Sequence, residues 1–404
     1  MPKIVQINAT CNWGSTGRIA EQIGLLATEH GWDCFIAHGA RYVRGSKLKA
    51  IPVGSKFDNM LHALKSKFLG GHGLGSKQST LYLVEILKEI QPDIVHLHNI
   101  HGYYINYPIL FKYLSEANIS VVWTLHDCWS MTGHCTHFDS IGCDRWKTGC
   151  YDCPQKKAQY GTVLLNRAKR NYQLKKECFT SVSNLTVVTV SKWLGSIVQD
   201  SYLKDATLRV INNGIDLNIF RPVTTDLKSR LNIPEEKKIL LGVASDWGVE
   251  KGLNEFVKLS EDPRCQVVLI GLTGEQIKAL PSSIIAIQRT SNQQELVEYY
   301  TMADMLVNPT YNDSFPTVNI EALACGTPVV TYRTGGSPEI LSPETGIVVD
   351  RGDYDALVGA IETCCKNGKS FYSDACVKRA NNLYNKDERF MDYIKLYEEL
   401  LSKK

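Results

Sequence analysis

The sequence predicts an α/β protein built from two domains, each with a parallel sheet. Short β-rich apolar runs alternate with helical periodicity along the whole chain, which is typical of strands joined by crossover helices. The runs fall into two series, separated by an Asn-Gly turn and a proline that interrupt the periodicity. With 404 residues, the chain is long enough for two or three domains.

The first series of apolar runs predicts the sheet of an N-terminal domain. A helix is expected over 18–30, where Ile19, Ile23 and Leu26 share one face and Gly31 suits a left-handed cap. The expected strands are 4–8, 33–38, 93–98, 120–127, 185–190 and 208–213.

The second series predicts the sheet of a C-terminal domain, which follows a joint at 213–222. Its expected strands are 238–245, 265–271, 283–288, 304–309, 327–332 and 345–350. We therefore expect domains at 1–216 and 217–404, with a polar helical tail over 374–401 that can pack on either one.

Composition excludes several classes of protein. No apolar run approaches the roughly 20 residues of a membrane-spanning helix, and residues 1–8 read as a buried strand rather than a signal peptide. Thirteen cysteines without a secretory signal argue against a disulfide framework. We expect a cytoplasmic protein.

The net charge of +3 conceals an uneven distribution. Residues up to 216 carry 24 Lys and Arg against 16 Asp and Glu, whereas the remainder carries 21 against 26. Basic residues concentrate in 41–77 and 156–176. Each run is either a solvated surface or a site for an anionic membrane or a phosphate-bearing substrate, at about 1 kcal/mol per basic residue near a membrane. No nucleic-acid-binding motif accompanies them, so we expect no nucleic-acid partner.

Residues 311–330 carry the strongest functional signal. Pro316 suits the first turn of a helix, and free amides from about 315 to 318 form an anion site suited to a diphosphate. Glu321 lies one turn further along, where its carboxylate can accept hydrogen bonds from a ribose diol. Asp313 precedes Glu321 by eight positions. The spacing alone is also compatible with an ordinary helix cap and a solvated glutamate.

This segment resembles the acidic-x7-acidic motif of retaining, family-4-like glycosyltransferases, and the similarity continues through Glu-Ala-Leu-Ala-Cys-Gly-Thr-Pro-Val-Val. Other landmarks of the family occur in order and extend the resemblance over nearly the whole chain: WGSTGR at 13–18, TLHD at 124–127, NGID at 213–216, EKG at 250–252 and GGSPE at 335–339. The resemblance implies the GT-B fold, in which two Rossmann-like domains face each other across a cleft, and it points to bacterial surface-polysaccharide transferases.

The resemblance also implies roles for individual residues. Lys251 would neutralise the donor diphosphate, Glu321 would bind the ribose, and Asp313 would contact the transferred sugar. His126 would contact the donor sugar near the reacting centre, and no cofactor is required for catalysis. The further donor-binding residues would be Gly14, Gly17, Ser314, Phe315, Pro316 and Thr317.

Two features depart from the family pattern. Asp313 stands where the family more often has Glu, so its carboxylate reaches one methylene less far. The family often has an arginine shortly before the lysine as a second phosphate clamp, but 243–251 contains none. Arg18 and Arg333 are the candidates to replace it.

Three histidines, His96, His98 and His101, have a spacing that suits a metal. His101 falls beyond the strand, however, and no carboxylate or cysteine in the same loop completes a ligand set. Structural or acceptor-binding roles are therefore preferred for them. Asp353 and Asp355 match a cation-binding DxD motif of another glycosyltransferase fold, but their place before a helix favours capping.

The loop at 128–155 is rich in cysteine. Cys150 and Cys153 form one half of a zinc site, which Cys135 and Cys143 can complete. Similar loops occur in a subset of these transferases. A structural zinc would order a long irregular loop, and the alternative is reduced cysteines without metal. Both interpretations remain open.

The predicted function is transfer of a sugar from a UDP- or GDP-linked donor to a glycan or lipid-linked acceptor in polysaccharide biosynthesis, with retention of configuration. Peripheral contact with the inner face of the membrane fits the basic N-terminal half. The alternatives are a nucleotide-sugar epimerase or a phosphorylase of the same fold, and a non-catalytic membrane-associated scaffold.

Overall fold

The computed structural model describes residues 1–157 and 160–403, which form two structural units. Unit 1 comprises Met1–Asn212 together with the chain from Arg389 onward, and unit 2 comprises Asn213–Glu388. The chain therefore enters unit 2 after Asn212 rather than after Asp216, and its last turns return to unit 1. This corrects the predicted boundary of the C-terminal domain at residue 404, which treated the tail as part of the second domain.

Unit 1 contains a seven-stranded parallel sheet in the order β3-β2-β1-β4-β5-β6-β7. All six expected strands are present. The sequence reading missed β3, because this edge strand is short, largely exposed and contains Pro52, which is tolerated only where no ladder hydrogen bond is required. The strands are β1 (Lys3–Asn8), β2 (Asp33–Gly39), β3 (Lys49–Val53), β4 (Ile94–Leu97), β5 (Ser120–Leu125), β6 (Leu185–Thr189) and β7 (Thr207–Val210).

Crossover helices connect these strands. The first helix begins at Gly14, four residues before the predicted start, because its polar first turn carries no apolar periodicity. Gly31 has φ +83°, as the cap prediction required. The helices are α1 (Gly14–Glu29), α2 (Lys56–Leu69), α3 (Lys77–Ile90), α4 (Tyr107–Glu116), α5 (Ala168–Phe179) and α6 (Lys192–Gln199).

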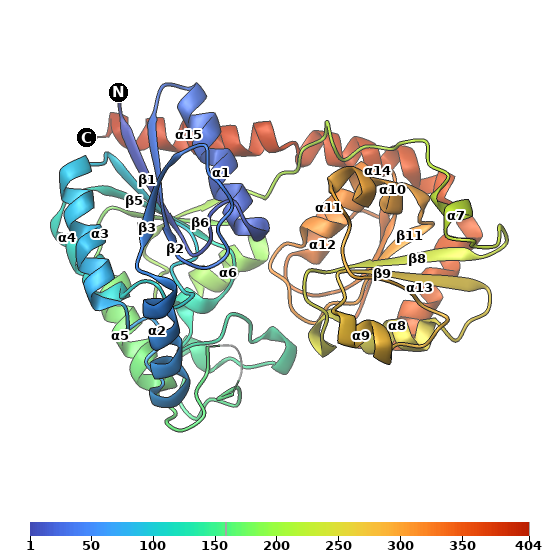
Figure 1. Ribbon diagram of the computed structural model, residues 1–404, viewed down its shortest axis with the longest axis horizontal. Coiled ribbons are helices and arrows are strands. Elements are labelled where there is room, and N and C mark those ends of the chain that lie inside the picture. The colour runs from blue at the N-terminus through green and yellow to red at the C-terminus, as the bar shows by residue number, and fades with distance from the viewer. Residues whose placement is uncertain (158–159, 404) are drawn as a thin grey trace. The chain divides into compact units, whose positions relative to one another are not determined.

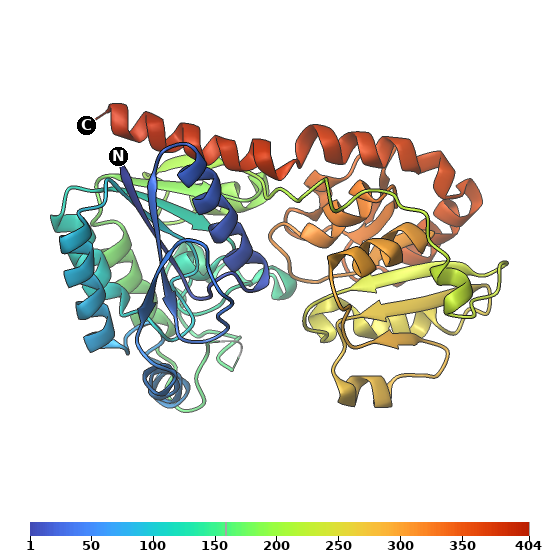
Figure 2. The same cartoon turned by 45° about the horizontal axis from the view of Figure 1, so that its top comes forward.

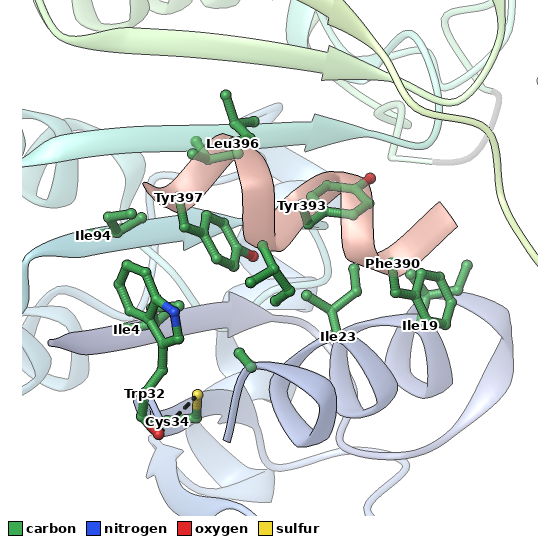
Figure 3. Packing of buried hydrophobic residues seen from close by; sticks show 14 of the residues in the cluster. Ile4, Ile19, Ile23, Trp32, Cys34, Ile94, Phe390, Tyr393, Leu396 and Tyr397 are labelled. Carbon is green, nitrogen blue, oxygen red and sulfur yellow. Dashed lines mark hydrogen bonds between the residues drawn. The ribbon is translucent and has the colours of Figure 1, made fainter. Parts of the chain in front are cut away.

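One face of this sheet is covered by α1 and by the last helix, α15 (Lys386–Ser402) (Figures 1 and 2). Phe390, Tyr393 and Tyr397 of α15 point into the same apolar cluster as Ile23 and Trp32 (Figure 3). Burying such aromatic side chains removes 150–250 Å² each, roughly, from water. The tail is therefore part of the core of unit 1, and its polar outer face explains why its sequence reads as peripheral.

Unit 2 contains a six-stranded parallel sheet in the order β10-β9-β8-β11-β12-β13, and its strands match all six predicted runs. They are β8 (Lys238–Val243), β9 (Cys265–Ile270), β10 (Ile285–Ile287), β11 (Met305–Asn308), β12 (Val329–Tyr332) and β13 (Gly346–Val349). The helices are α7 (Leu227–Arg230), α8 (Leu253–Leu259), α9 (Gly274–Ala279), α10 (Gln293–Met302), α11 (Thr317–Ala324), α12 (Ser337–Ile340), α13 (Tyr354–Asn367) and α14 (Lys369–Leu383).

The capping prediction for the DxD sequence is confirmed. The side chain of Asp353 accepts a hydrogen bond from the amide of Ala356, 2.9 Å away, at the start of α13.

Among the described residues, no helix is long and apolar enough to cross a membrane.

Each sheet reverses its direction of growth at one point, between β1 and β4 in unit 1 and between β8 and β11 in unit 2. Open α/β sheets bind ligands beyond the carboxyl ends of their strands at such points. The loops after β8 and β11 are therefore the first place to look for a ligand site in unit 2, and those after β1, β4 and β5 in unit 1.

We expect acid to destabilise unit 1. Burial lowers the pKa of His96 to about 3 and that of His62 to about 4, both from 6.5, so these imidazoles are neutral in the folded state. Their contribution to stability is complete above pH 6.5 and is lost as the pH falls towards 4. The slope is about 1.4 kcal/mol per pH unit for each additional proton that the unfolded chain binds.

Unfolding free energies measured near neutral pH and near pH 5 would test this. The two ring nitrogens of His96 form hydrogen bonds with Tyr397 Oη (2.6 Å) and Thr124 Oγ1 (2.8 Å). His96→Asn should therefore be less stable at neutral pH, because it loses these hydrogen bonds. It should also lose less stability on acidification, because one titrating group is gone. Equal losses in the variant and the parent chain would contradict the assignment.

Candidate active site

The strongest candidate site lies at the carboxyl edge of the sheet of unit 2, where the loop after β8 meets the loop after β11. The amide of Tyr311 donates to the carbonyl of Glu250 (2.8 Å), and Thr310 Oγ1 donates to the same oxygen (3.2 Å). Gly252 has φ +75°, and a Cβ there would lie 2.5 Å from the carbonyl oxygen of Pro309. The close approach of the two loops fixes the position of the residue between them, Lys251.

Lys251 forms an ion pair with Asp313. Its Nζ lies 2.8 Å from Asp313 Oδ2 and 3.4 Å from the carbonyl oxygen of Asn312, and both side chains of the pair are partly exposed. The other carboxylate oxygen of Asp313 accepts a hydrogen bond from the amide of Phe315 (3.2 Å). The sequence assigned these two residues separate roles, whereas the structure makes them direct partners.

Helix α11 begins beside this pair, with Pro316 as its N-cap and no capping side chain. The first-turn amides of Thr317 and Val318 are therefore not used by a cap, as an anion site requires. The amide of Phe315 is not free, because it donates to Asp313, and its side chain is buried with its ring against Tyr384. Donor contact by Phe315 stays a prediction.

Three buried hydroxyl groups near the start of α11 lack a hydrogen-bond partner among the described residues. They belong to Ser314, Thr334 and Ser337, and each residue is at most 3% exposed. Buried hydroxyls are normally satisfied, so orphaned ones call for an explanation such as a ligand or an ordered water. The predicted donor residue Ser314 is among them.

Glu321 lies on α11, one turn into the helix and partly exposed. Its Oε2 accepts a hydrogen bond from the hydroxyl of Tyr300 (2.8 Å), which is fully buried at the end of α10. This hydrogen bond from the buried hydroxyl orients the carboxylate of Glu321. Sequence reasoning missed Tyr300, because nothing in its spacing links a helix end to a residue 21 positions later.

A second glycine holds the loop that carries Asp313 and Ser314. Gly335 has φ +51°, and a Cβ there would lie 1.7 Å from the carbonyl oxygen of Asp313. The amide of the next residue, Gly336, donates to the carbonyl of Ser314 (3.2 Å). The Gly-Gly sequence of the GGSPE landmark thus supports the site through backbone contact rather than through a side chain.

The role of the two arginines proposed as phosphate clamps stays a prediction. Arg333 is paired with Asp350 (Nε to Oδ1, 3.0 Å) and its side chain is 60% exposed. Arg18 is exposed on α1, in unit 1. In the same region, Gly17 packs against Thr10, and Gly14 opens the helix with φ +66°. Donor contact by Gly14 and Gly17 stays a prediction.

His126 follows β5 in unit 1 and belongs to a chain of hydrogen bonds. Gln6 donates its amide to the carbonyl of Ala20 (2.8 Å), so its oxygen faces His98 Nε2 (3.0 Å), which must carry the proton. His98 Nδ1 is then an acceptor for His126 Nε2 (3.3 Å). Burial lowers the pKa of His126 to about 4. The imidazole of His126 is therefore neutral at physiological pH, with Nδ1 free of a proton.

Asp127, the next residue, pairs with His101 (Oδ2 to Nε2, 2.9 Å). Burial alone would raise the pKa of Asp127, but the charge and hydrogen bond of His101 outweigh it and lower the pKa to about 2. His101 Nδ1 lies 3.2 Å from the hydroxyl of Tyr160. Structural or acceptor-binding roles were preferred for the three histidines, and each has a side-chain partner: His96 bonds to the tail helix, His98 to His126, and His101 to Asp127.

A cavity of about 860 Å³ lies beside Tyr160, between α2 and the loop at 160–163. Its lining combines basic, aromatic and apolar side chains: Arg41, Tyr42, Lys56, Met60, Leu64, Lys67, Tyr103, Lys157, Tyr160 and Val163. The predicted basic run at 156–176 contributes to it, although residues 158–159 of that run lie outside the described part of the chain.

The predicted zinc set is only partly brought together. His134, Cys135 and Cys153 have ligand atoms within 4.8 Å of one another, and this group excludes Cys143 and Cys150 among the described residues. The spacing of the cysteines predicted an all-cysteine set and therefore did not include His134.

Two Rossmann-like units, each with a parallel sheet, form the GT-B fold. Comparison with protein families refines this. A model described as Glycosyltransferase Family 4 matches residues 62–219, and a model described as Glycosyl transferases group 1 matches residues 223–383. The chain belongs to the family-4-like glycosyltransferases.

Among relatives, the chain is 25% identical over 280 residues to WcaC of Escherichia coli (strain K12), described as "Putative colanic acid biosynthesis glycosyl transferase". The alignment covers 68% of each protein. It is 27% identical over 195 residues to the D-inositol 3-phosphate glycosyltransferase of Corynebacterium jeikeium (strain K411), which covers 42% of this chain and 46% of that enzyme. The chain thus matches less than half the length of the inositol enzyme.

Solved structures show the same fold at low sequence identity. Sucrose-phosphate synthase from Thermosynechococcus elongatus aligns over 100% of both chains with a TM-score of 0.75 and 18% identity. HepE of Anabaena, in complex with UDP-glucose, aligns over 100% of both chains with a TM-score of 0.65 and 16% identity.

Gly335→Ala should disrupt the candidate site. The positive φ and the overlap with the carbonyl of Asp313 predict a loss of about 2 kcal/mol or more in the free energy of unfolding. Gly359→Ala is the matched control, since its Cβ meets nothing within 4 Å in the middle of α13. There, alanine should stabilise the protein by up to about 1 kcal/mol. Chemical denaturation of both variants tests this, and equal stabilities would refute the packing argument.

Proposed function

We propose that this glycosyltransferase moves a sugar from a nucleoside diphosphate donor to a lipid-linked glycan acceptor in bacterial surface-polysaccharide assembly, with retention of configuration. The observation that carries the proposal is the arrangement at the start of α11. Lys251 and Asp313 are paired there, beside uncapped amides, and Glu321 is oriented by Tyr300. Retention is supported by the resemblance to the retaining members of this family.

Donor cleavage develops negative charge on the leaving diphosphate. Fixed amides at the start of α11 and the ammonium group of Lys251 stabilise that charge without rearrangement during the reaction. A bound diphosphate competes with Asp313 for Lys251, which frees the carboxylate of Asp313 to contact the sugar. The leaving phosphate then accepts the proton of the attacking hydroxyl group, as expected for front-face transfer.

The relatives support the choice of substrates to test. The HepE structures are described as complexes with UDP and with UDP-glucose, which makes UDP-sugars the first donors to examine. WcaC is described by a role in colanic acid biosynthesis, a polysaccharide. These descriptions concern those proteins, and they enter here only as support for a nucleotide-sugar donor and a glycan product.

The cavity beside Tyr160 suits an acceptor that carries both charge and lipid. Arg41, Lys56 and Lys67 supply positive charge, and Met60 and Leu64 supply an apolar wall. A diphosphate joined to a polyprenyl chain has matching chemistry. Tyr160 links the cavity to the carboxyl end of β5 through its contact with His101.

Helix α2, which borders this cavity, is amphipathic in the inverse sense. Its buried residues are polar, namely Asn59, His62 and Ser66, whereas large apolar side chains face outward. Together with the neighbouring loop they form what we call the α2 apolar surface: Phe57, Met60, Leu61, Leu64, Phe68, Leu69, Val163, Leu164 and Leu165.

The α2 apolar surface is bordered by basic residues. Lys56, Lys65 and Lys67 lie on the helix itself, and the amide of Val163 donates to the carbonyl of Lys67 (2.8 Å), which holds the loop against the helix end. Exposed apolar residues flanked by lysines are typical of helices that lie in the interface of an anionic membrane. We propose that unit 1 binds the membrane through this surface.

Lys251→Ala and Glu321→Ala should abolish donor use. Loss of one electrostatic contact to the leaving group predicts a fall in kcat of about 100-fold or more. Both variants should also lose the rise in melting temperature that UDP or UDP-sugars give to the parent chain. Lys278→Ala, an exposed lysine on α9, is the control and should behave as the parent.

Full activity in either site variant would refute the site assignment. Turnover of the donor without any acceptor, to an isomer of the same nucleotide sugar, would indicate an epimerase instead. If no nucleoside diphosphate shifts the melting temperature of the parent chain, the donor proposal fails.

Phe57→Ser should weaken binding to vesicles that contain anionic phospholipid. Phe57 is 64% exposed on the α2 apolar surface, and its burial in a membrane contributes about 1.5–3 kcal/mol, or roughly 10- to 100-fold in affinity. Phe371→Ser is the matched control, because Phe371 is 67% exposed in unit 2, outside the surface. Co-sedimentation with vesicles measures both. Equal binding by the two variants would contradict the proposal that the α2 apolar surface binds the membrane.

A further inference from the structure

We propose that His134, Cys135, Cys150 and Cys153 bind one structural zinc ion in unit 1. This proposal is independent of the donor and membrane proposals, since none of these four residues belongs to either site. It also differs from the four-cysteine set that the spacing predicted, because His134 takes the place of Cys143.

Three of the ligand atoms are already gathered. Those of His134, Cys135 and Cys153 lie within 4.8 Å of one another, and His134 Nε2 is 3.7 Å from Cys153 Sγ. Cys135 and Cys153 also interact directly through their sulfur atoms. Sulfur and imidazole nitrogen in a compact group are the preferred ligands of tetrahedral zinc.

Cys150 lies outside this group of three, and we assign it as the fourth ligand because its sulfur is held next to the segment that carries His134. The sulfur of Cys150 accepts a hydrogen bond from the amide of Gly133 (3.2 Å), the residue directly before His134. Cys150 itself is buried. Backbone amides that point at sulfur stabilise a thiolate and orient it as a ligand. Cys150 also has φ +52° and Asp152 φ +41°, so the chain turns sharply between the two cysteines.

A buried lysine lies near the sulfur atoms. Lys175 is fully buried, and its Nζ donates to the carbonyls of Trp129 (2.6 Å) and Thr132 (3.0 Å) and lies 3.4 Å from the Trp129 ring centroid. The groups that interact with it electrostatically include Asp127, Cys135 and Cys150. Zinc with three thiolates and one neutral imidazole would carry one net negative charge, and two of those thiolates would lie near this lysine.

The metal would order the loop that covers the carboxyl end of β5. In this loop, regular structure is confined to three short 3₁₀ turns, at Trp129–Met131, Asp139–Ile141 and Arg145–Lys147. In the first of these turns, the amide of Trp129 donates a hydrogen bond to Asp127 Oδ1 (2.8 Å). Zinc joins the segment at His134 to the segment at Cys153, and closure of such a loop stabilises the fold. Zinc would replace the protons of the three thiols, and it would take the place of the Gln155 carbonyl as the partner of His134 Nε2 (3.0 Å).

The test is metal analysis of the full chain, purified under reducing conditions without chelator. We expect about one zinc per chain, a lower melting temperature after chelator treatment, and X-ray absorption that shows three sulfur ligands at about 2.3 Å and one nitrogen at about 2.0 Å. Cobalt substitution should give sulfur-to-metal charge-transfer bands. These measurements use the parent chain and do not depend on whether a variant folds.

Variants then identify the ligands. Cys153→Ser and Cys150→Ser should lose most of the metal, whereas Cys143→Ser, in the same loop but outside the proposed ligand set, should keep about one zinc per chain. Loss of zinc from Cys143→Ser with retention in Cys150→Ser would overturn the ligand set. Absence of zinc and of cobalt binding in the parent chain, or a disulfide between Cys135 and Cys153 in peptide maps, would overturn the site.

Discussion

Parallel strand pairing is the constraint on which the function of this protein depends. A parallel sheet requires every connection to cross over, so the loops that follow its strands emerge at the same edge. In unit 2 this places Lys251, after β8, beside Asp313, after β11, although they lie 62 positions apart. In unit 1 it places His98 beside His126 in the same way. Both candidate sites are consequences of strand order.

The backbone, more than the side chains, shapes the candidate site in unit 2. Gly252 and Gly335 allow carbonyl groups of neighbouring loops to approach more closely than any side chain would permit. The helix start at Pro316 presents amides without a cap. Such dipoles are fixed by the fold, so at the site that we propose they would stabilise an anion without reorganisation. Lys251 adds a positive charge, and its ion pair with Asp313 joins the two loops.

Unit 1 contains buried polar side chains in addition to its apolar core. Buried neutral histidines, among them His96 and His98, join β4 to the tail helix and to the end of β5. On the outside, α2 turns its apolar side chains away from the core. Burial holds the histidines neutral, and the membrane contact that we propose would remove the exposed side chains of α2 from water.

Local periodicity and turns are properties of neighbouring residues, so the sequence was enough to predict the two sheets and the joint near residue 213. The family motif likewise singles out Lys251, Asp313 and Glu321, whose roles stay predictions. The pattern did not reveal β3, whose edge position suppresses the usual alternation. Three features appeared with the folded structure and not before: the tail belongs to the core of unit 1, Tyr300 orients Glu321, and His134 lies with Cys135 and Cys153. These contacts join segments far apart or of different chemistry, and packing alone brings them together.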